Sequence, residues 1–235
     1  LTEEYYGSND NLKYTKSIPS SYCFLNNAEN VRFHTLELEE KTLLGYAWNK
    51  AYSLDHIKKL GIRYKNITLI EDIIFNLEFI EDIDKITILE GKFYHYRKGI
   101  ESSLTSKFLP NYFELNSERV QKVLDQQKRW NVCTDEAKNI LANIYVRYII
   151  SALQRNCDKR SNMNHMQRKA WAKSLFNNSL FNELIPYFKS ENLILSFLGF
   201  ILKHRMTLSV LSIARFIYII KKHSPIIFSK LKQNR

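Results

Sequence analysis

The sequence predicts a mainly α-helical protein with a few short β-strands. In the second half of the chain, apolar residues recur every three or four positions, which is the spacing of one helix face. In the first half, two short runs rich in β-branched and aromatic residues indicate strands. The hydrophobic fraction of 45% excludes a disordered chain. With only 6 Gly and 4 Pro, a collagen or a glycine-rich phosphate loop is excluded too.

The first half is expected to contain three helices and two strands. They are helices over 35–49, 54–60 and 73–79 and strands over 85–90 and 92–97. Glu71 and Asp72 occupy the first turn of the third helix, where acids are favoured, and Gly61 ends the second. Residues 1–34 are polar and are expected to be irregular, with a loop at 7–11.

After Pro110 the pattern is helical throughout. Ser117 is expected to cap a helix that ends near Trp130, and Thr134 to cap a second helix with a wide amphipathic stripe. Four further helices are expected over 164–177, 179–189, 192–203 and 207–222.

The positive charge lies at the C-terminal end. The chain has 35 Lys and Arg against 24 Asp and Glu, a formal net charge of +11. Residues 158–235 hold 14 basic residues and three acids, a difference of 14 − 3 that equals the whole excess. Such asymmetry predicts an anionic partner, either a nucleic acid or the anionic face of a membrane.

Two late segments, 193–202 and 208–220, are strongly apolar but shorter than the ~20 residues that a membrane-spanning helix needs. They are interpreted either as buried helices or as helices that lie in a membrane interface. In the second case the basic residues near them would meet anionic headgroups. These residues are Lys203, His204, Arg205, Lys221, Lys222, Lys230 and Lys232.

The cysteines Cys23, Cys133 and Cys157 are far apart and form no zinc-binding pattern. Neither a disulfide framework nor a structural metal site is therefore expected. No signal peptide is expected either, since the sequence does not begin with a basic and then an apolar run. The expected location is cytoplasmic, with peripheral contact to the inner face of the plasma membrane left open.

The Glu71–Asp72 pair is the first candidate for chemistry. Acids in a first helical turn have an ordinary structural explanation, because they complement the helix dipole. The functional interpretation is that one carboxylate acts as a general base, held rigidly at the helix start.

Two other patterns are candidates for substrate contacts. Trp48, Asn49 and Lys50 end the first expected helix, where Trp48 could equally anchor the core. His95 and Arg97 lie two residues apart and share one face of the last expected strand. That face is either an exposed polar edge or a surface for a phosphate or a sugar hydroxyl.

Taken together and in this order, these patterns resemble the C-terminal part of the catalytic domain of family-2 glycosyltransferases, over roughly residues 40–110. These are bacterial enzymes that build capsules, exopolysaccharides and the outer parts of lipopolysaccharide. The matching elements are WNK at 48–50, GIRY at 61–64, ED at 71–72 with FN at 75–76, YHYR at 94–97 and SLT at 103–105.

The resemblance implies the GT-A fold, here as the C-terminal part of a GT-A α/β catalytic domain followed by a helical region. It implies that Asp72 is the catalytic base of an inverting sugar transfer and that Glu71 shapes the site. Trp48, Asn49 and Lys50 would line the acceptor side. His95, Arg97, Ser103 and Thr105 would contact substrate.

The chain departs from the family in its donor half, because the first strand and the DxD metal motif are not found. Asp82-Ile83-Asp84 spells DxD but follows the ED pair, so it is interpreted as a solvated turn. Mg²⁺ or Mn²⁺ is therefore expected for the complete enzyme and no cofactor for this chain. The chain alone is expected to be inactive.

The expected organisation is an acceptor-side part over 1–113 and a basic helical region over 114–235. The partners expected of the complete enzyme are a nucleotide-sugar donor and a glycan or lipid-linked acceptor. The alternative is a non-enzymatic helical module that binds nucleic acid or another anionic partner through its basic C-terminal third. Nucleic acid is the less favoured partner, since the basic residues alternate with long apolar runs.

Overall fold

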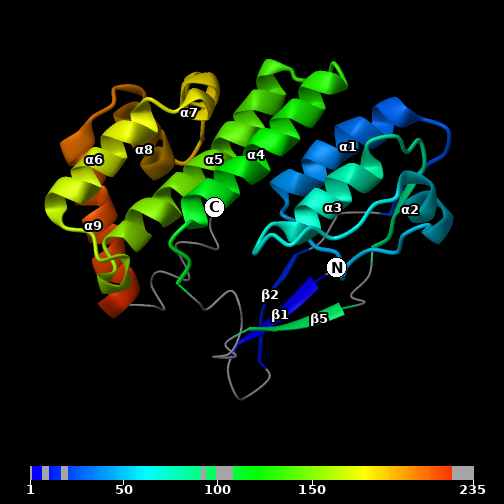
Figure 1. The fold of residues 1–235 in the computed structure, drawn as a ribbon, viewed down its shortest axis with the longest axis horizontal. Coiled ribbons are helices and arrows are strands. Elements are labelled where there is room, and N and C mark those ends of the chain that lie inside the picture. Colours follow the sequence, from blue (N-terminus) through cyan, green and yellow to red (C-terminus); the bar gives the residue numbers. More distant parts are fainter. Residues whose placement is uncertain (1, 7–10, 17–20, 91–93, 99–107, 224–235) are drawn as a thin grey trace. The chain divides into compact units, whose positions relative to one another are not determined.

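The computed structural model describes residues 2–6, 11–16, 21–90, 94–98 and 108–223 (Figure 1). Most of these residues are helical, which confirms a mainly α-helical protein with a few short strands. The chain divides into unit 1, Leu1–Leu109 with Lys122–Val132, and unit 2, Pro110–Gln121 with Cys133–Arg235. Helix α4 (Tyr112–Arg129) contributes its first part to unit 2 and its second part to unit 1. The functional division at residue 113 stays a prediction.

Unit 1 contains two small sheets. In the first, β1 (Thr2–Tyr6) lies between β2 (Asn11–Lys16), which is antiparallel to it, and β5 (Tyr94–Lys98), which is parallel. In the second, β3 (Tyr22–Phe24) pairs with β4 (Ile86–Ile88) in antiparallel fashion. Strands β4 and β5 fall on the two runs from which strands were expected.

The expectation that residues 1–34 are irregular is wrong. They supply three strands and the beginning of helix α1 (Ala28–Glu40). Each N-terminal strand is short, and β1 and β3 pair with strands from much later in the sequence. Their stability therefore comes from tertiary pairing, which a local pattern does not reveal. Most of the expected loop at 7–11 lies outside the described residues.

The helix expected over 35–49 is also wrong in its bounds. Helix α1 begins earlier, where the Asn27 side chain accepts a hydrogen bond from the Asn30 N–H at 3.0 Å. It ends at Glu40 because Thr42 takes a positive φ of 58°. The N–H groups of Leu43 and Leu44 then both donate to the Leu38 carbonyl, at 2.8 and 3.1 Å, and close the helix end. Residues 43–53 therefore form an irregular segment.

Helices α2 (Leu54–Leu60) and α3 (Glu71–Ile80) confirm the next two expectations. Ser53 caps α2, and Gly61 ends it with a φ of 64°, a conformation that suits glycine. Helix α3 is the core helix of unit 1, with six of its ten residues buried. They are Ile73, Ile74, Phe75, Asn76, Leu77 and Ile80.

Polar bonds join the end of α3 to the second part of α4, within unit 1. Gln126 donates to the Leu77 carbonyl at 2.9 Å and to the Glu81 carboxylate at 2.8 Å. Arg129 donates to both Glu81 oxygens, at 3.0 and 2.8 Å. Burial raises the pKa of Glu81, but the bonds from Arg129 and Gln126 outweigh it and hold the pKa below its usual value. These contacts fix the C-terminal end of α3.

Unit 2 is helical in its described part. Thr134 caps the long helix α5, as expected, by accepting a hydrogen bond from the Ala137 N–H at 3.1 Å. Ser117 is not a cap, since α4 begins five residues earlier at Tyr112. The remaining helices confirm the expected ones: α5 (Asp135–Asn156), α6 (His165–Phe176), α7 (Ser179–Leu184) with the 3-10 turn η3 (Ile185–Tyr187), α8 (Leu193–Lys203) and α9 (Thr207–His223).

Helix α5 forms the centre of the unit 2 core. It contacts α7, η3 and α9, and Tyr145 and Leu141 on it are fully buried. Burial raises the pKa of Tyr145 to about 12, partly opposed by Ser117. No helix in the described part of the chain is both long and apolar enough to cross a membrane.

Gly199 allows α8 to pack closely on the turn that follows α7. A Cβ at this position would overlap the ring of Phe188, which is itself buried. Gly199→Ala is therefore expected to lower the free energy of unfolding by about 1–3 kcal/mol through overpacking. The gain in helix propensity, about 1 kcal/mol, offsets part of this loss. Urea unfolding measures the change, with exposed Ser196→Ala on the same helix as control. Equal stability of the two variants would contradict the packing argument.

Candidate functional site

The candidate site is built on the irregular segment that follows α1, and Lys50 holds this segment in shape. The Lys50 ammonium donates to the carbonyls of Leu43 and Tyr46 at 2.8 and 2.5 Å, and to the Asn49 side-chain oxygen at 2.7 Å. Asn49 in turn donates to the Leu43 carbonyl at 3.1 Å. Charge-assisted bonds of this kind are stronger than neutral ones. Lys50 and Asn49 thus close a compact loop over residues 43–50.

Asn76 fixes this loop to helix α3. Its side chain is buried, and its amide group donates to the carbonyls of Leu44 at 2.7 Å and Tyr46 at 3.2 Å. Its side-chain oxygen accepts a hydrogen bond from the Tyr52 hydroxyl at 2.6 Å. One amide therefore bonds two residues of the loop and one that follows it, which sets the distance between loop and helix.

The carboxylates of the ED pair lie at the start of the same helix. The Ala47 N–H donates to Asp72 Oδ2 at 3.3 Å, which places this carboxylate against the loop. Asp72 is half-buried. Glu71 Oε2 is buried and has no hydrogen-bond partner among the described residues. Leaving a buried carboxylate oxygen without a partner costs free energy.

Two tyrosines lie near these carboxylates. Burial raises the pKa of Tyr52, and Tyr64 and Asp72 nearby raise it further. Burial also raises the pKa of Tyr64, with further contributions from Asp72 and Glu71. The Tyr64 ring is stacked on Phe75 of α3, at 4.5 Å between ring centroids. Both hydroxyls therefore stay protonated at neutral pH and can donate hydrogen bonds.

Three aromatic rings are stacked beside the loop. Trp48 lies 4.7 Å from Tyr46 and 4.3 Å from Tyr94, measured between ring centroids, with interplanar angles of 24° and 23°. Tyr94 begins strand β5, so the stack joins the loop to that strand. The Tyr94 side chain is 40% exposed. The stack therefore presents an aromatic surface to solvent close to the loop.

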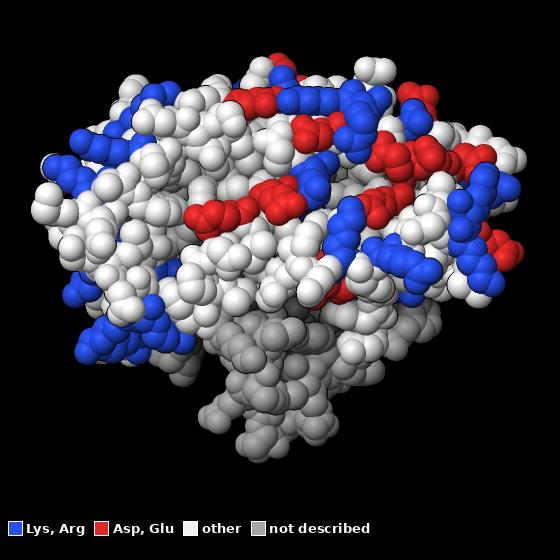
Figure 2. All heavy atoms as spheres, in the orientation of Figure 1, with Lys and Arg blue, Asp and Glu red and all other residues white. Residues whose placement is uncertain are grey.

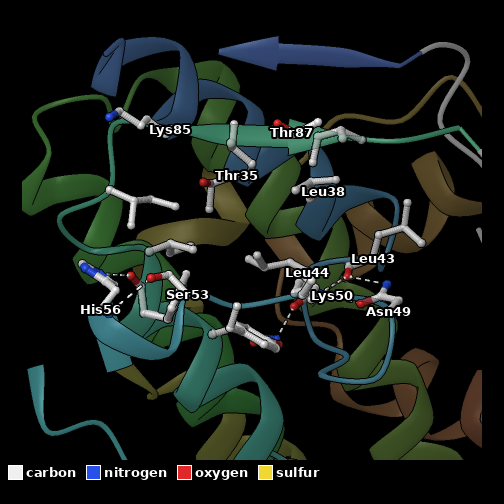
Figure 3. A pocket seen from close by; sticks show the side chains of 18 of the residues that line it. Thr35, Leu38, Leu43, Leu44, Asn49, Lys50, Ser53, His56, Lys85 and Thr87 are labelled. Carbon is white, nitrogen blue, oxygen red and sulfur yellow. Dashed lines mark hydrogen bonds between the residues drawn. The ribbon is translucent and has the colours of Figure 1, made fainter. Parts of the chain in front are cut away.

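A cavity of about 1020 Å³ opens in unit 1 next to this loop (Figure 3). Thr35 and Leu38 of α1 and Thr87 of β4 lie on one side of it, and Ser53 and His56 lie opposite. Trp48, Asn49, Lys50, Tyr52, Asn76 and Tyr94 all line it. Asp72 and Glu71 are not among the residues that line it. The cavity and the Asp72 carboxylate thus lie against the same loop.

The structure brings four of the nine expected site residues together. Trp48, Asn49 and Lys50 lie on one loop, and Asp72 is bonded to the same loop through Ala47. His95 and Arg97 lie on β5, where they are in register with Glu3 and Tyr5 of β1.

Other parts of the expected site are not placed. The side chains of His95 and Arg97 lie outside the described part of the structure. Ser103 and Thr105 lie outside the described residues altogether. Their expected contacts with substrate stay predictions.

Several residues of the site were not expected from the sequence, namely Tyr46, Tyr52, Tyr64, Asn76 and Tyr94. Asn76 had a readable signal, because it follows Asp72 by four residues and so shares a face of α3 with it. Tyr94 belongs to the YHYR motif but was not assigned a role. Tyr64 likewise belongs to the GIRY motif without an assigned role, and its ring is placed by Phe75 of α3. Tyr46 and Tyr52 meet the site only through the fold of the loop.

Metal binding finds no support in the described residues, where no three His, Cys, Asp or Glu side chains are grouped for it. Asp82 and Asp84 are exposed after the end of α3, as in a solvated turn, but both also line the cavity. The expectation that a complete enzyme uses Mg²⁺ or Mn²⁺ stays a prediction.

No family model, no curated protein and no solved structure matches this chain. The resemblance to family-2 glycosyltransferases therefore rests on the sequence motifs alone.

Proposed function

We propose that unit 1 is the acceptor-binding side of an inverting glycosyltransferase of GT-A type, with Asp72 as its general base. The observation that carries the proposal is the hydrogen bond from Ala47 to Asp72. It places a half-buried carboxylate against the loop that bears Trp48, Asn49 and Lys50 and the aromatic stack. A carboxylate beside an aromatic surface is suited to hold a sugar ring and to take a proton from one of its hydroxyls.

The proposed chemistry is a single displacement. Asp72 removes the proton from an acceptor hydroxyl while that oxygen forms a bond to the anomeric carbon of the donor sugar. The bond between that carbon and the nucleotide diphosphate breaks, and the diphosphate leaves with the electron pair. Attack from the opposite side inverts the anomeric carbon. The described residues offer no cluster for a divalent cation, so no step is assigned to a metal on this chain.

The other residues have positioning roles in this proposal. Lys50 and Asn76 fix the loop, because their hydrogen bonds go to its carbonyl groups. Tyr94 supplies the exposed aromatic surface for the apolar face of a sugar ring, and Trp48 is stacked against Tyr94 and supports it. Tyr64, as a protonated phenol near Asp72, can donate to a sugar oxygen. The proposed setting is the synthesis of bacterial surface polysaccharide in the cytoplasm, with a glycan or lipid-linked acceptor.

Direct sugar binding tests this assignment without a need for turnover. In saturation-transfer NMR with a panel of free mono- and disaccharides, the full chain is expected to show binding to at least one sugar. Tyr94→Ala is expected to weaken that binding at least about tenfold, or about 1.4 kcal/mol. Phe33→Ala is the matched control, since it removes an exposed ring from α1 in the same unit. If no sugar of the panel showed a saturation-transfer signal, the acceptor site would be rejected. An equal loss of sugar binding in both variants would reject it too.

A further inference from the structure

Helix α8 leaves a row of large apolar side chains in solvent. Leu193, Phe197 and Phe200 are 84%, 62% and 52% exposed. They follow one another at intervals of four and three residues and therefore share one helix face. The opposite face of α8 is buried through Leu198 and Leu202. The exposed row is thus not the face that builds the core.

Helix α9 repeats this arrangement. Leu208, Phe216 and Ile219 are 66%, 63% and 43% exposed, while Val210 and Ala214 on the other side are buried. The eight- and three-residue intervals again place the exposed side chains on one face. A three-residue turn connects the two helices, and they contact each other. Soluble monomers rarely expose so many large apolar residues on neighbouring elements.

Positive charge accompanies both apolar rows. Arg215, Lys222 and His223 are exposed on the same face of α9, and Lys203 and Arg205 are exposed at the end of α8. Acids are scarce here, since Glu183 and Glu191 are the only ones between residues 165 and 223. Figure 2 shows basic side chains among uncharged ones over the region of α6 to α9, at the left of Figure 1. The surface therefore combines exposed apolar groups with cations.

We propose that the outer faces of α8 and α9 bind the surface of an anionic lipid membrane. The Leu, Phe and Ile side chains enter the boundary between headgroups and acyl chains, and the Lys and Arg side chains meet lipid phosphates. The helices lie along the surface, because neither is long enough to cross it. This inference is carried by unit 2 alone and does not depend on sugar transfer by unit 1.

The charge and the chemistry of this surface favour lipid over other occupants. A second copy of the chain would bring the same positive surface, and like charges oppose such contact. Nucleic acid offers phosphates but no apolar layer that could receive six large apolar side chains, and protein surfaces that bind it are polar and basic. An anionic bilayer supplies phosphates for the cations and an apolar layer for the apolar side chains.

Vesicle co-sedimentation of the full chain tests the proposal. We expect binding to vesicles of phosphatidylcholine with phosphatidylglycerol and at least tenfold weaker binding to phosphatidylcholine alone. Binding to the anionic vesicles is expected to fall as the salt is raised from about 0.1 M to 1 M, since the screening length shrinks from about 10 to 3 Å. The binding that remains at about 1 M salt measures the contribution of the apolar contacts.

Two double variants separate the contributions. Phe197→Asn with Phe216→Asn is expected to weaken binding at least tenfold and to leave the melting temperature unchanged, because both rings are exposed. Arg215→Gln with Lys222→Gln is expected to remove the preference for anionic vesicles. Phe33→Asn, an exposed ring in unit 1, is the control and is expected to bind as the unaltered chain does.

Four outcomes would overturn the proposal. The first two are no binding to either vesicle and equal binding to both. The third is vesicle binding that the two phenylalanine substitutions leave unchanged. The fourth is an equal loss of vesicle binding in the Phe33→Asn control. Analytical ultracentrifugation and a duplex-DNA titration complete the test. A dimer, or tight DNA binding, that depends on Phe197 and Phe216 and occurs without vesicle binding would assign the surface to that partner instead.

Discussion

Asp72→Asn is expected to reduce glycosyl transfer by about 10²–10⁴-fold, the usual contribution of a general base. The measurement needs a preparation that transfers sugar from a nucleotide-sugar donor. The substitution keeps the shape of the side chain, and the amide oxygen can still accept the hydrogen bond from Ala47. The loop is therefore expected to stay in place. Because the lost step is proton removal, kcat is expected to fall while the KM for the acceptor changes little.

Asp55→Asn is the matched control for this experiment. Asp55 also lies in the first turn of a helix, α2, but it is exposed. It is expected to leave transfer unchanged. Glu71→Gln tests the neighbouring position, where the unpartnered carboxylate oxygen is buried. If Asp72→Asn retained near-normal kcat, or if Asp55→Asn lowered it equally, the assignment of the base would fail.

Three helix boundaries were predicted correctly from local residues. Thr134, Gly61 and the acids at 71–72 mark boundaries that the structure confirms, since capping and left-handed termination depend on local residues. The helix expected over 35–49 has the wrong bounds because the apolar spacing continues past the true end of α1. Apolar residues at Leu43 and Leu44 continue the helical spacing, but both belong to the turn that ends α1. Periodicity does not distinguish a further helical turn from a loop that packs apolar side chains on the same core.

The candidate site was predicted in part. The sequence pointed to Asp72 and to the 48–50 motif, and the structure brings them together through Ala47. The sequence did not reveal that Lys50 donates hydrogen bonds to carbonyl groups of its own loop. Those hydrogen bonds depend on backbone angles such as the positive φ of Thr42. The contact of Trp48 with Tyr94 joins residues far apart in sequence. Such contacts follow from tertiary structure and leave no local pattern.

The largest effect on stability is expected from Asn76→Leu. Leucine branches at the same carbon as asparagine, but it makes the position apolar and removes both donors and the acceptor of the amide. The carbonyls of Leu44 and Tyr46 and the hydroxyl of Tyr52 each lose a partner at a buried or half-buried position. An unmet buried polar group costs about 1–3 kcal/mol, so a loss near 3 kcal/mol in the free energy of unfolding is expected. Urea unfolding of the full chain measures it.

A local readout distinguishes loop release from general destabilisation. Hydrogen exchange is expected to rise first at the amides of residues 43–50, since Asn76 makes two of the hydrogen bonds between this loop and α3. Tyr52→Phe is the graded control, because it removes only one of the three bonds and is expected to cost about 1 kcal/mol. Sugar binding by unit 1 is expected to weaken in Asn76→Leu and to persist in Tyr52→Phe. If Asn76→Leu left both stability and loop exchange unchanged, the loop would be held by other contacts, and the proposed positioning role of Asn76 would be wrong.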